Sequence, residues 1–507
     1  MASRDQEHRI SIPDHNNAGG SGVSVGPGFI NEEYLSSLPS KPDLDEEWLR
    51  KVEAKIDCAF AGLAVYPPWY IEDETQPKIR ELPLRDRISQ PGLETEGGLS
   101  QPSVVTIGPF HRKDPTRISN NDKWVIVWLT NWLHNLDLGR SLLKMKNQVK
   151  EARNSYHKLD VSDDKSFAEM LLRDSYFILF TLTIKLRKQL THYTLMPLTP
   201  KFTKEPPHKL FQDDHSKFLN IICNKDEIAP DLLIFDNQIP FFVIEELFKE
   251  LKSKKPLHEY ALEFFETIHP RSARHFIDKN SPPKFLHLLD LFHWSRVPQD
   301  KYIELIISSS PQELDVLDWV PQTPNAMELR ESATVFEKKT SGSTLDITFH
   351  RRRFKRIIRV FHIPELHILD YSSLIFYNLI VFEIHSSTRG RCTMAFSVLM
   401  RSLLRREEDV KLLQQRGILV SSSMTDRQLI DLFARLSRLT ENHEMPRDLY
   451  AICRQVQSHH KNLVSRLCGG IIVQYFSKPV VTLSVFVAAL LFVPTLLQTI
   501  YAMIYHS

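Results

Sequence analysis

The chain has 507 residues, 42% of them hydrophobic and 25% charged, which is the composition of a globular protein large enough for one or two hydrophobic cores. Its formal net charge of +2 argues against a general attraction to nucleic acid or acidic lipid, so any such attraction must be local. The 5 cysteines include no Cys-x-x-Cys pair, which argues against a disulfide framework and a cysteine zinc site.

The N-terminal part begins with a segment of low apolar content. Residues 1–43 contain clustered glycines and are predicted to be a disordered tail without the apolar stretch of a signal peptide. Residues 44–467 are predicted to form a single domain. Its first apolar pattern has helical spacing and covers residues 48–63, and the Pro- and Gly-containing stretch at 70–102 is expected to be an irregular surface connection.

Two long helical patterns follow, at residues 122–145 and 167–190. Trp124, Trp128 and Trp132 recur at fourfold spacing in the first of them, which places all three rings on one stripe. Such a stripe could be a ligand platform, but packing in the core is the more common use. The second pattern is interrupted by charged residues, so we expect a central core helix rather than a membrane span.

Two shorter stretches have their own patterns. Residues 104–108 are a β-branched run ended by glycine and are predicted to be a strand. The densest apolar stretch is 231–248, where Pro240 is placed to open a helix. Asn237 and Gln238 precede that proline between apolar neighbours. They could bind a ligand, but we expect them to satisfy backbone groups at the helix entry.

The C-terminal half contains segments with the alternating pattern of strands and segments with the helical pattern. Alternating β-branched residues at 343–350 and 357–369 predict a small sheet around residues 343–369. The other apolar patterns of this half have a helical period: residues 285–294, 326–336, 374–384, 395–404, 407–415, 426–436 and 447–467. The fold class is therefore predicted to be α+β, a predominantly helical soluble body with a small β-sheet.

One basic cluster stands out within the expected sheet. It consists of Arg351, Arg352, Arg353, Lys355, Arg356 and Arg359. We expect a solvated turn and edge strand, because basic side chains protect sheet edges from pairing. Binding of anionic lipid or of nucleic-acid phosphate at this surface stays open as an alternative.

The chain lacks the common catalytic motifs. The chain contains no phosphate-binding glycine loop, no dinucleotide fingerprint, no His-Glu-x-x-His and no Gly-x-Ser-x-Gly elbow. The letters HRKD at residues 111–114 match part of a kinase catalytic loop, but the other kinase motifs are missing, so we interpret the match as chance. We therefore expect no enzyme activity, no cofactor and no metal site, with an unrecognised membrane-tethered enzyme as the alternative.

The C-terminal end predicts a membrane anchor. Residues 480–504 carry no charged side chain and, at about 1.5 Å per residue, would extend about 37 Å, enough to cross a hydrocarbon core of about 30 Å. They are predicted to be one transmembrane helix, preceded by a juxtamembrane segment at 468–479. Lys461, Arg466 and Lys478 lie before the helix, so the positive-inside rule leaves the N-terminal body in the cytosol.

The order of several motifs resembles the plant family named domain of unknown function 247, over the chain from about residue 45 to the end. VVTIGPFHRKDP is similar to the family's opening motif, and DLLIFDNQIPFFVIEELF is similar to its Asn-Gln-Ile-Pro segment. AMELRESATVFEKK, TLDITF, IPELHI, YNLIVFE, EEDVKLLQQRGILV and the final apolar run follow in the family's order. Departures occur around Asp122 and Lys123, at Asp174 to Phe177, and at Asp236, where the family usually has Glu.

The resemblance implies a set of motif positions that we interpret as structural: Gly108, Pro109, His111, Asn237, Gln238, Pro240, Asp346, Pro364, Asn378, Glu383, Asp409 and Gly417. It also implies a plant, single-pass membrane protein without an established activity. Some grass members of the family are implicated in pollen self-incompatibility, and a divergent chain could belong to that group.

Residues and resemblance together predict a non-enzymatic interaction or recognition protein with a cytosolic body. A protein partner is expected, a homo-oligomer is compatible with the sequence, and no nucleic-acid partner is expected. The alternatives are a pollen self-incompatibility determinant and a membrane-tethered enzyme.

Overall fold

The structure is a computed structural model that divides the chain into two units, Met1–Glu46 and Glu47–Ser507. It describes the following residues: 45–63, 101–112, 116–156, 163–183, 224–270, 284–297, 323–339, 346–352, 355–386, 390–441, 443, 447–476 and 479–505. The predicted tail at 1–43 and most of the predicted irregular stretch at 70–102 lie outside this part of the chain.

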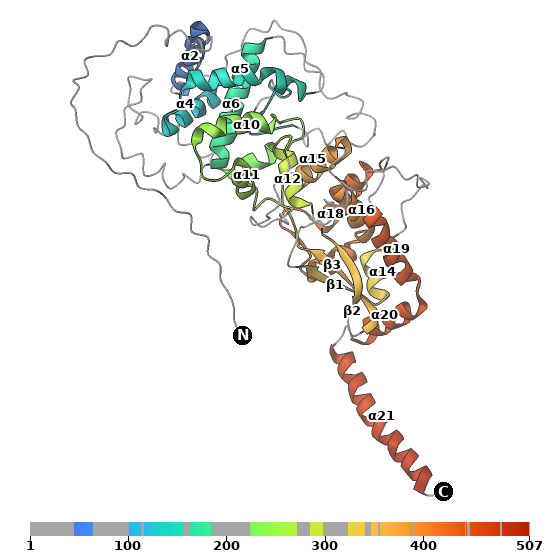
Figure 1. Cartoon of the computed structure of the whole chain (residues 1–507). Coiled ribbons are helices and arrows are strands. Elements are labelled where there is room, and N and C mark those ends of the chain that lie inside the picture. Colours follow the sequence, from blue (N-terminus) through green and yellow to red (C-terminus); the bar gives the residue numbers. More distant parts are fainter. Residues whose placement is uncertain are drawn as a thin grey trace, which may run out of the picture. The chain divides into compact units, whose positions relative to one another are not determined.

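The first half of the described chain is helical (Figure 1). Its elements are α2 (Glu46–Leu63), α4 (Asp122–His134), α5 (Leu138–Asn154), α6 (Asp164–Thr183), α9 (Lys225–Asp231), α10 (Phe241–Phe248), η3 (Lys249–Leu251), α11 (Leu257–Phe264) and α12 (Leu288–Arg296). Helix α6 is central, because every residue from Phe167 to Leu182 is buried. Helices α4, α5, α10 and α11 pack against it, as predicted for a core helix.

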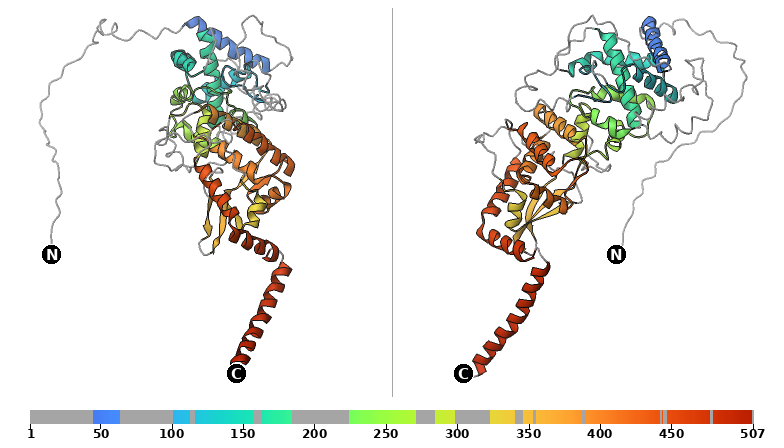
Figure 2. Two further views of the ribbon diagram at one scale, coloured as in Figure 1. Left: turned by 90° about the vertical axis from the view of Figure 1, so that its right-hand side faces the viewer. Right: turned by 180° about the vertical axis from the view of Figure 1, so that it is seen from behind.

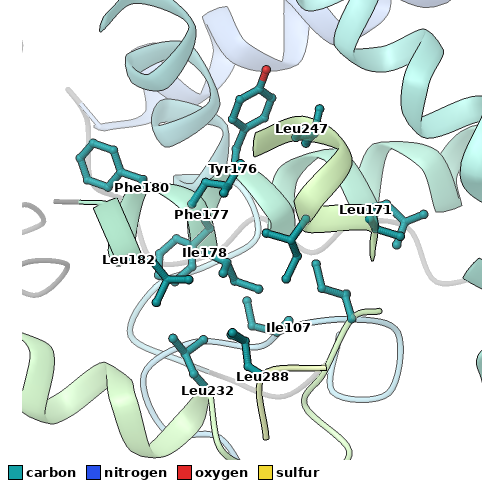
Figure 3. Close-up of a cluster of buried hydrophobic side chains, with 14 of the residues drawn as sticks. Ile107, Leu171, Tyr176, Phe177, Ile178, Phe180, Leu182, Leu232, Leu247 and Leu288 are labelled. Atoms are coloured by element: carbon teal, nitrogen blue, oxygen red, sulfur yellow. The ribbon is translucent and has the colours of Figure 1, made fainter. Parts of the chain in front are cut away.

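These helices enclose the first of two hydrophobic clusters, part of which is drawn in Figure 3. Tyr176 and Phe177 of α6 lie in it with Leu247 of α10 and Leu288 of α12. Ile107 joins them from the extended segment that precedes α4. The tryptophan stripe also belongs here: Trp124 and Trp128 are buried in the cluster and Trp132, stacked on Trp128, packs against it.

The pattern at 122–145 contains two helices, where the sequence predicted one. Asn135 adopts a left-handed conformation with φ of 50° and ends α4, with its N–H directed to the carbonyls of Asn131 and Trp132. Asparagine is one of the few residues that tolerate this conformation at a helix end. Asp137 then begins α5 by accepting a hydrogen bond from the Arg140 N–H.

The second half of the chain carries the sheet and the remaining helices. It comprises α14 (Ala326–Glu331), β1 (Thr334–Lys339), β2 (Thr348–Arg352), β3 (Lys355–Pro364), β4 (Leu366–Ile368), α15 (Ser372–His385), α16 (Cys392–Leu403), α17 (Glu407–Gln415), β5 (Leu419–Ser421), α18 (Asp426–Arg438), α19 (Arg447–Lys461), α20 (Leu463–Phe476) and α21 (Pro479–Tyr505). The three-stranded sheet has the order β1-β3-β2, with β1 parallel and β2 antiparallel to β3, and β4 pairs with β5 in a separate parallel ribbon.

One face of the three-stranded sheet is apolar. Phe336, Phe349 and Phe361 are opposite one another on β1, β2 and β3, and all three belong to the second hydrophobic cluster. Helices α15 to α19 supply most of the rest of this cluster. The prediction of a helix at 326–336 was wrong in its second half, since the helix ends at Glu331 and Ala333, at a φ of 59°, turns the chain into β1.

The C-terminal pattern at 447–467 also divides into two helices, α19 and α20, at Asn462. Helix α21 (Figure 2) then runs without interruption through Pro494. Its described side chains are exposed. Its Val487–Tyr505 window is long and apolar enough to cross a membrane, and none of that window is buried. Sixteen α-helices and two small sheets in the described residues make the fold α+β and mostly helical, as predicted.

Candidate functional site

The segment at 103–108 is extended but is not the strand that its β-branched residues predicted. In the described residues its only ladder contact is a single bridge between Val105 and Ile118. Its N–H groups bind side chains instead: Asp231 Oδ2 accepts from the N–H of Ser103 at 3.1 Å, Val104 at 2.6 Å and Val105 at 2.8 Å. A carboxylate at the end of α9 thus takes the place of a neighbouring strand.

Asn237 continues this pattern further along the segment. Its Oδ1 accepts from the Ile107 N–H at 2.5 Å, and its Nδ2 donates to the carbonyls of Val105 at 3.1 Å and Asp231 at 2.9 Å. The side chain is almost fully buried. It therefore joins the extended segment to the loop between α9 and α10 through three hydrogen bonds to backbone groups.

Asp174 completes the set, which we call the amide-binding trio: Asp174, Asp231 and Asn237. Its Oδ2 accepts from the Gly108 N–H at 2.9 Å. Gly108 has a φ of 75°, and a Cβ atom there would collide with the carbonyl oxygen of Gln238. Only glycine permits both this conformation and this close approach.

The carboxylate of Asp174 also pairs with Lys123 of α4. The Nζ and Oδ1 atoms are 2.8 Å apart and both side chains are inaccessible to solvent. Lys123 donates further to the Thr106 carbonyl and to Asn120 Oδ1. Burial lowers the pKa of Lys123 to about 8, while the nearby Asp174 carboxylate acts in the opposite direction and favours the charged ammonium.

Gln238 and His111 fix the neighbouring loops. Gln238 Nε2 donates to the carbonyls of Leu232 and Ile234, each at 2.8 Å, and its Oε1 accepts from the Leu289 N–H at the start of α12. His111 Nε2 lies 2.8 Å from Asp236 Oδ1, within ion-pair distance.

The two family-motif prolines lie in the same region. Pro109 is buried beside Gly108, and Pro240 stands at the N-cap of α10 with a φ of −60°. The motif residues around Gly108 and those around Asn237 are far apart in the sequence but lie together in the structure. Each polar residue among them binds a backbone group or a buried side chain.

A second group of motif residues connects the two hydrophobic clusters through α15. Asn378 Oδ1 accepts from the Phe235 N–H at 2.9 Å. Glu383, fully buried, has Oε1 2.8 Å from His293 Nε2 of α12 and accepts from the N–H groups of Thr393 and Met394 at the start of α16. The carboxylate therefore binds α12 on one side and α16 on the other.

The remaining motif positions are separate from these groups. Asp409 is buried and accepts from the N–H groups of Met327, Arg405 and Arg406. Gly417, at a φ of 65°, follows the end of α17. Asp346 pairs with Lys339 beside the sheet, and Pro364 ends β3.

The basic cluster is divided between the two faces of the sheet. Arg351 lies opposite Arg359 in the β2–β3 register, on the face that carries Phe349 and Phe361. Arg352 points to the other face, with its Nη2 4.0 Å from Glu337. Arg353 and the side chains of Lys355 and Arg356 lie outside the described part of the chain.

Three buried polar groups were not predicted from the sequence to be important: Asp231, His293 and Arg296. The Arg296 guanidinium donates to the carbonyls of Phe265, Ile268 and Pro270, and burial lowers its pKa to about 9. The available signal was a charged or polar residue within an otherwise apolar helix, which indicates a buried partner. No group of three or more metal-ligating side chains occurs among the described residues.

Comparison with known proteins gives the family. The DUF247 family, described as plant proteins of unknown function, matches residues 94–494. The UPF0481 protein At3g47200 of Arabidopsis thaliana is 22% identical over 425 residues, which cover 80% of this chain and 83% of that protein. No solved structure matches the chain. Because the family match covers far more than half of the residues, this chain belongs to the DUF247 family of plant proteins.

Proposed function

We propose that this protein is a non-enzymatic interaction protein, held on a membrane by helix α21, with its body in the cytosol. The observation that carries the proposal is the exposed apolar surface of α21. At about 1.5 Å per residue its 27 residues extend about 40 Å, more than the hydrocarbon thickness of about 30 Å. The described side chains between Leu483 and Tyr505 are exposed, which for apolar side chains is favourable in lipid and unfavourable in water.

The charges beside α21 support the orientation. Lys461 and Arg466 are exposed before the helix, and Lys478 directly precedes it in the sequence. Basic residues accumulate on the cytosolic side of a span. An acceptor site for N-glycosylation added after residue 507 should be glycosylated in microsomes, while one added before residue 45 should stay unmodified. The reverse pattern would contradict the cytosolic body.

The buried polar residues support interaction rather than catalysis. Lys123, Asp174, Asn237 and Glu383 bind backbone groups or each other, which is how residues that hold a scaffold are used.

The partner test compares the full chain with a chain lacking residues 470–507. Affinity capture from solubilised plant membranes should recover a stoichiometric protein partner with both chains, because the proposed recognition surface lies on the body. Recovery only with α21 present would assign the partner to the helix. Recovery of no stoichiometric protein would contradict the proposal, and a substrate turned over by the purified chain would favour the enzyme alternative.

The finer role in pollen self-incompatibility remains a prediction from the family resemblance and from the divergent Asp236. This role requires that the gene is expressed in pollen. It also requires that replacing the gene by another allele changes which pollen a pistil rejects. Normal rejection after such a replacement would dismiss this role and leave the membrane-anchored interaction protein in place.

A further inference from the structure

Helix α20, immediately before α21, has one face packed on the body. Gly469 lies so close to the backbone of Glu331 and Ala333 that a Cβ atom would collide with both. Ser465, one turn earlier, is buried on the same face and hydrogen-bonds His459 Nδ1 at 3.2 Å. The connection between α14 and β1 thus holds α20 in a fixed orientation (Figure 1).

The opposite face of α20 is apolar and exposed. Leu463 is 72% exposed, Val464 53%, Leu467 69% and Ile471 52%. At about 100° per residue these four side chains occupy an arc of about 100°, centred on the side opposite Ser465 and Gly469. Four neighbouring large apolar side chains on one exposed stripe form a contact surface rather than scattered surface residues.

Basic groups lie near α20, which packs against β3. Lys461 and Arg466 are exposed on α19 and α20. Arg351 and Arg359 face each other across β2 and β3, and Arg359 lies over the Phe349 ring, which also contacts His459. In the described residues neither arginine of this like-charged pair has a carboxylate within ion-pair distance, an arrangement that favours an external anion.

We infer that α20 lies in the headgroup region of the membrane, with its exposed stripe in the lipid and the Arg351–Arg359 pair facing anionic headgroups. This inference rests on the proposed span, because α21 begins three residues after α20 ends. A helix that precedes a membrane span by only a few residues must lie close to the bilayer surface. Apolar and basic side chains on such a helix favour contact with lipid and anionic headgroups. The body is therefore in contact with the membrane surface rather than attached to the membrane through α21 alone.

Lipid contact of the full chain in vesicles tests the inference. Single cysteines at Leu467, Leu490 and Leu286 are introduced into a chain whose own cysteines are replaced, and each is labelled with a small fluorophore. Leu490 lies in α21, and Leu286 is a control that lies just before α12, with comparable exposure of 57%. Vesicles of phosphatidylcholine, with and without phosphatidylserine, carry a lipid quencher.

We expect severalfold stronger quenching at 467 than at 286, and strong quenching at 490. Quenching at 490 with none at 467 would overturn the inference and leave the anchor intact, whereas no quenching at either position would overturn both. Self-quenching at 467 that rises with the ratio of protein to lipid, without lipid quenching, would assign the stripe to a second copy of the chain and contradict the inference.

A matched pair of variants tests the anionic contact. Phosphatidylserine should increase the quenching at 467, and Arg351→Gln should remove most of that increase. Arg352→Gln is the control, because Arg352 is adjacent in sequence but points to the other face of the sheet near Glu337. Equal effects of the two variants, or no effect of phosphatidylserine, would contradict the role of the Arg351–Arg359 pair.

Discussion

Asp174 binds Lys123 with one carboxylate oxygen and the Gly108 N–H with the other, at 2.8 Å and 2.9 Å. This carboxylate connects α6, α4 and the extended segment at 103–108 in the interior of the first cluster. Ion pairs buried in this way contribute little net stability compared with apolar packing, but removal of one partner leaves a buried charge. The pair is therefore a sensitive point of the fold.

Replacing Asp174 with Asn should destabilise the protein by about 3–5 kcal/mol, because buried Lys123 would lose its counterion and the Gly108 N–H its charged acceptor. The control is Asp164→Asn, since Asp164 is 74% exposed and pairs with Arg153 at the surface. A surface pair of that kind is worth at most about 1 kcal/mol. Urea unfolding of the full chain in detergent measures both, and equal losses would contradict the role of the buried pair.

The same carboxylate predicts an acid limb in stability. Burial raises the pKa of Asp174, but the charges of Lys123 and Arg173 and two hydrogen bonds outweigh burial, so the net shift is downward from 3.8. Because the pKa of Asp174 is lower in the folded state than its usual 3.8, the ionised carboxylate stabilises the fold above pH 3.8. This stabilisation is lost as the pH falls through the folded-state pKa. The difference in unfolding free energy between wild type and Asp174→Asn should shrink below that pH. A constant difference would contradict the assignment.

Replacing Asn237 with Ala should cost about 3 kcal/mol, because it leaves the Ile107 N–H and the carbonyls of Val105 and Asp231 without this partner. Asn154, exposed at the end of α5, is the control, and its change to Ala should stay within about 0.5 kcal/mol. Urea unfolding measures both changes. A loss at Asn237 no larger than that of the control would show that the amide is dispensable.

Replacing Glu383 with Ala should separate the two hydrophobic clusters. The buried carboxylate binds His293 of α12 and the first N–H groups of α16, so its loss should cost about 3 kcal/mol and broaden unfolding into two steps. Glu408→Gln, at an exposed position in the first turn of α17, should leave a single step. Calorimetry distinguishes the outcomes, and one sharp transition in Glu383→Ala would refute this coupling.

Adjacent glycines in α20 should respond in opposite directions. Gly469→Ala forces α20 off the backbone at Glu331 and Ala333 and should cost about 1–3 kcal/mol. Gly470→Ala meets nothing within 4 Å and should stabilise the helix by about 0.5–1 kcal/mol. Hydrogen exchange of α20 and urea unfolding measure the two variants. Similar behaviour of both would mean that α20 does not pack on this connection.

Local periodicity was sufficient for much of the fold. The exposed apolar helix α21, the buried stripe of α4 and the entry of α10 at Pro240 follow from residues close together in sequence. The end of α14 was not predicted, because Ala333 carries a left-handed turn without the glycine or asparagine that signals one.

The contacts of the candidate site join residues that are far apart in the sequence, and such contacts could not be predicted from local patterns. Residues 104–108 have the composition of a strand, but their N–H groups bind Asp231 from more than a hundred residues away. No local pattern encodes a side chain that replaces a neighbouring strand. The motif residues Gly108 and Asn237 could be recognised by resemblance, whereas their joining through the amide-binding trio required the three-dimensional structure.

The most direct test of the account is alkaline carbonate extraction of membranes that contain the full chain. The control is Val487→Lys with Leu491→Lys, which places two charges on the exposed surface of α21 at a cost of about 3 kcal/mol each in a bilayer. The account predicts that the wild-type protein stays in the membrane pellet while the control is released. Release of the intact wild-type protein into the supernatant would contradict it.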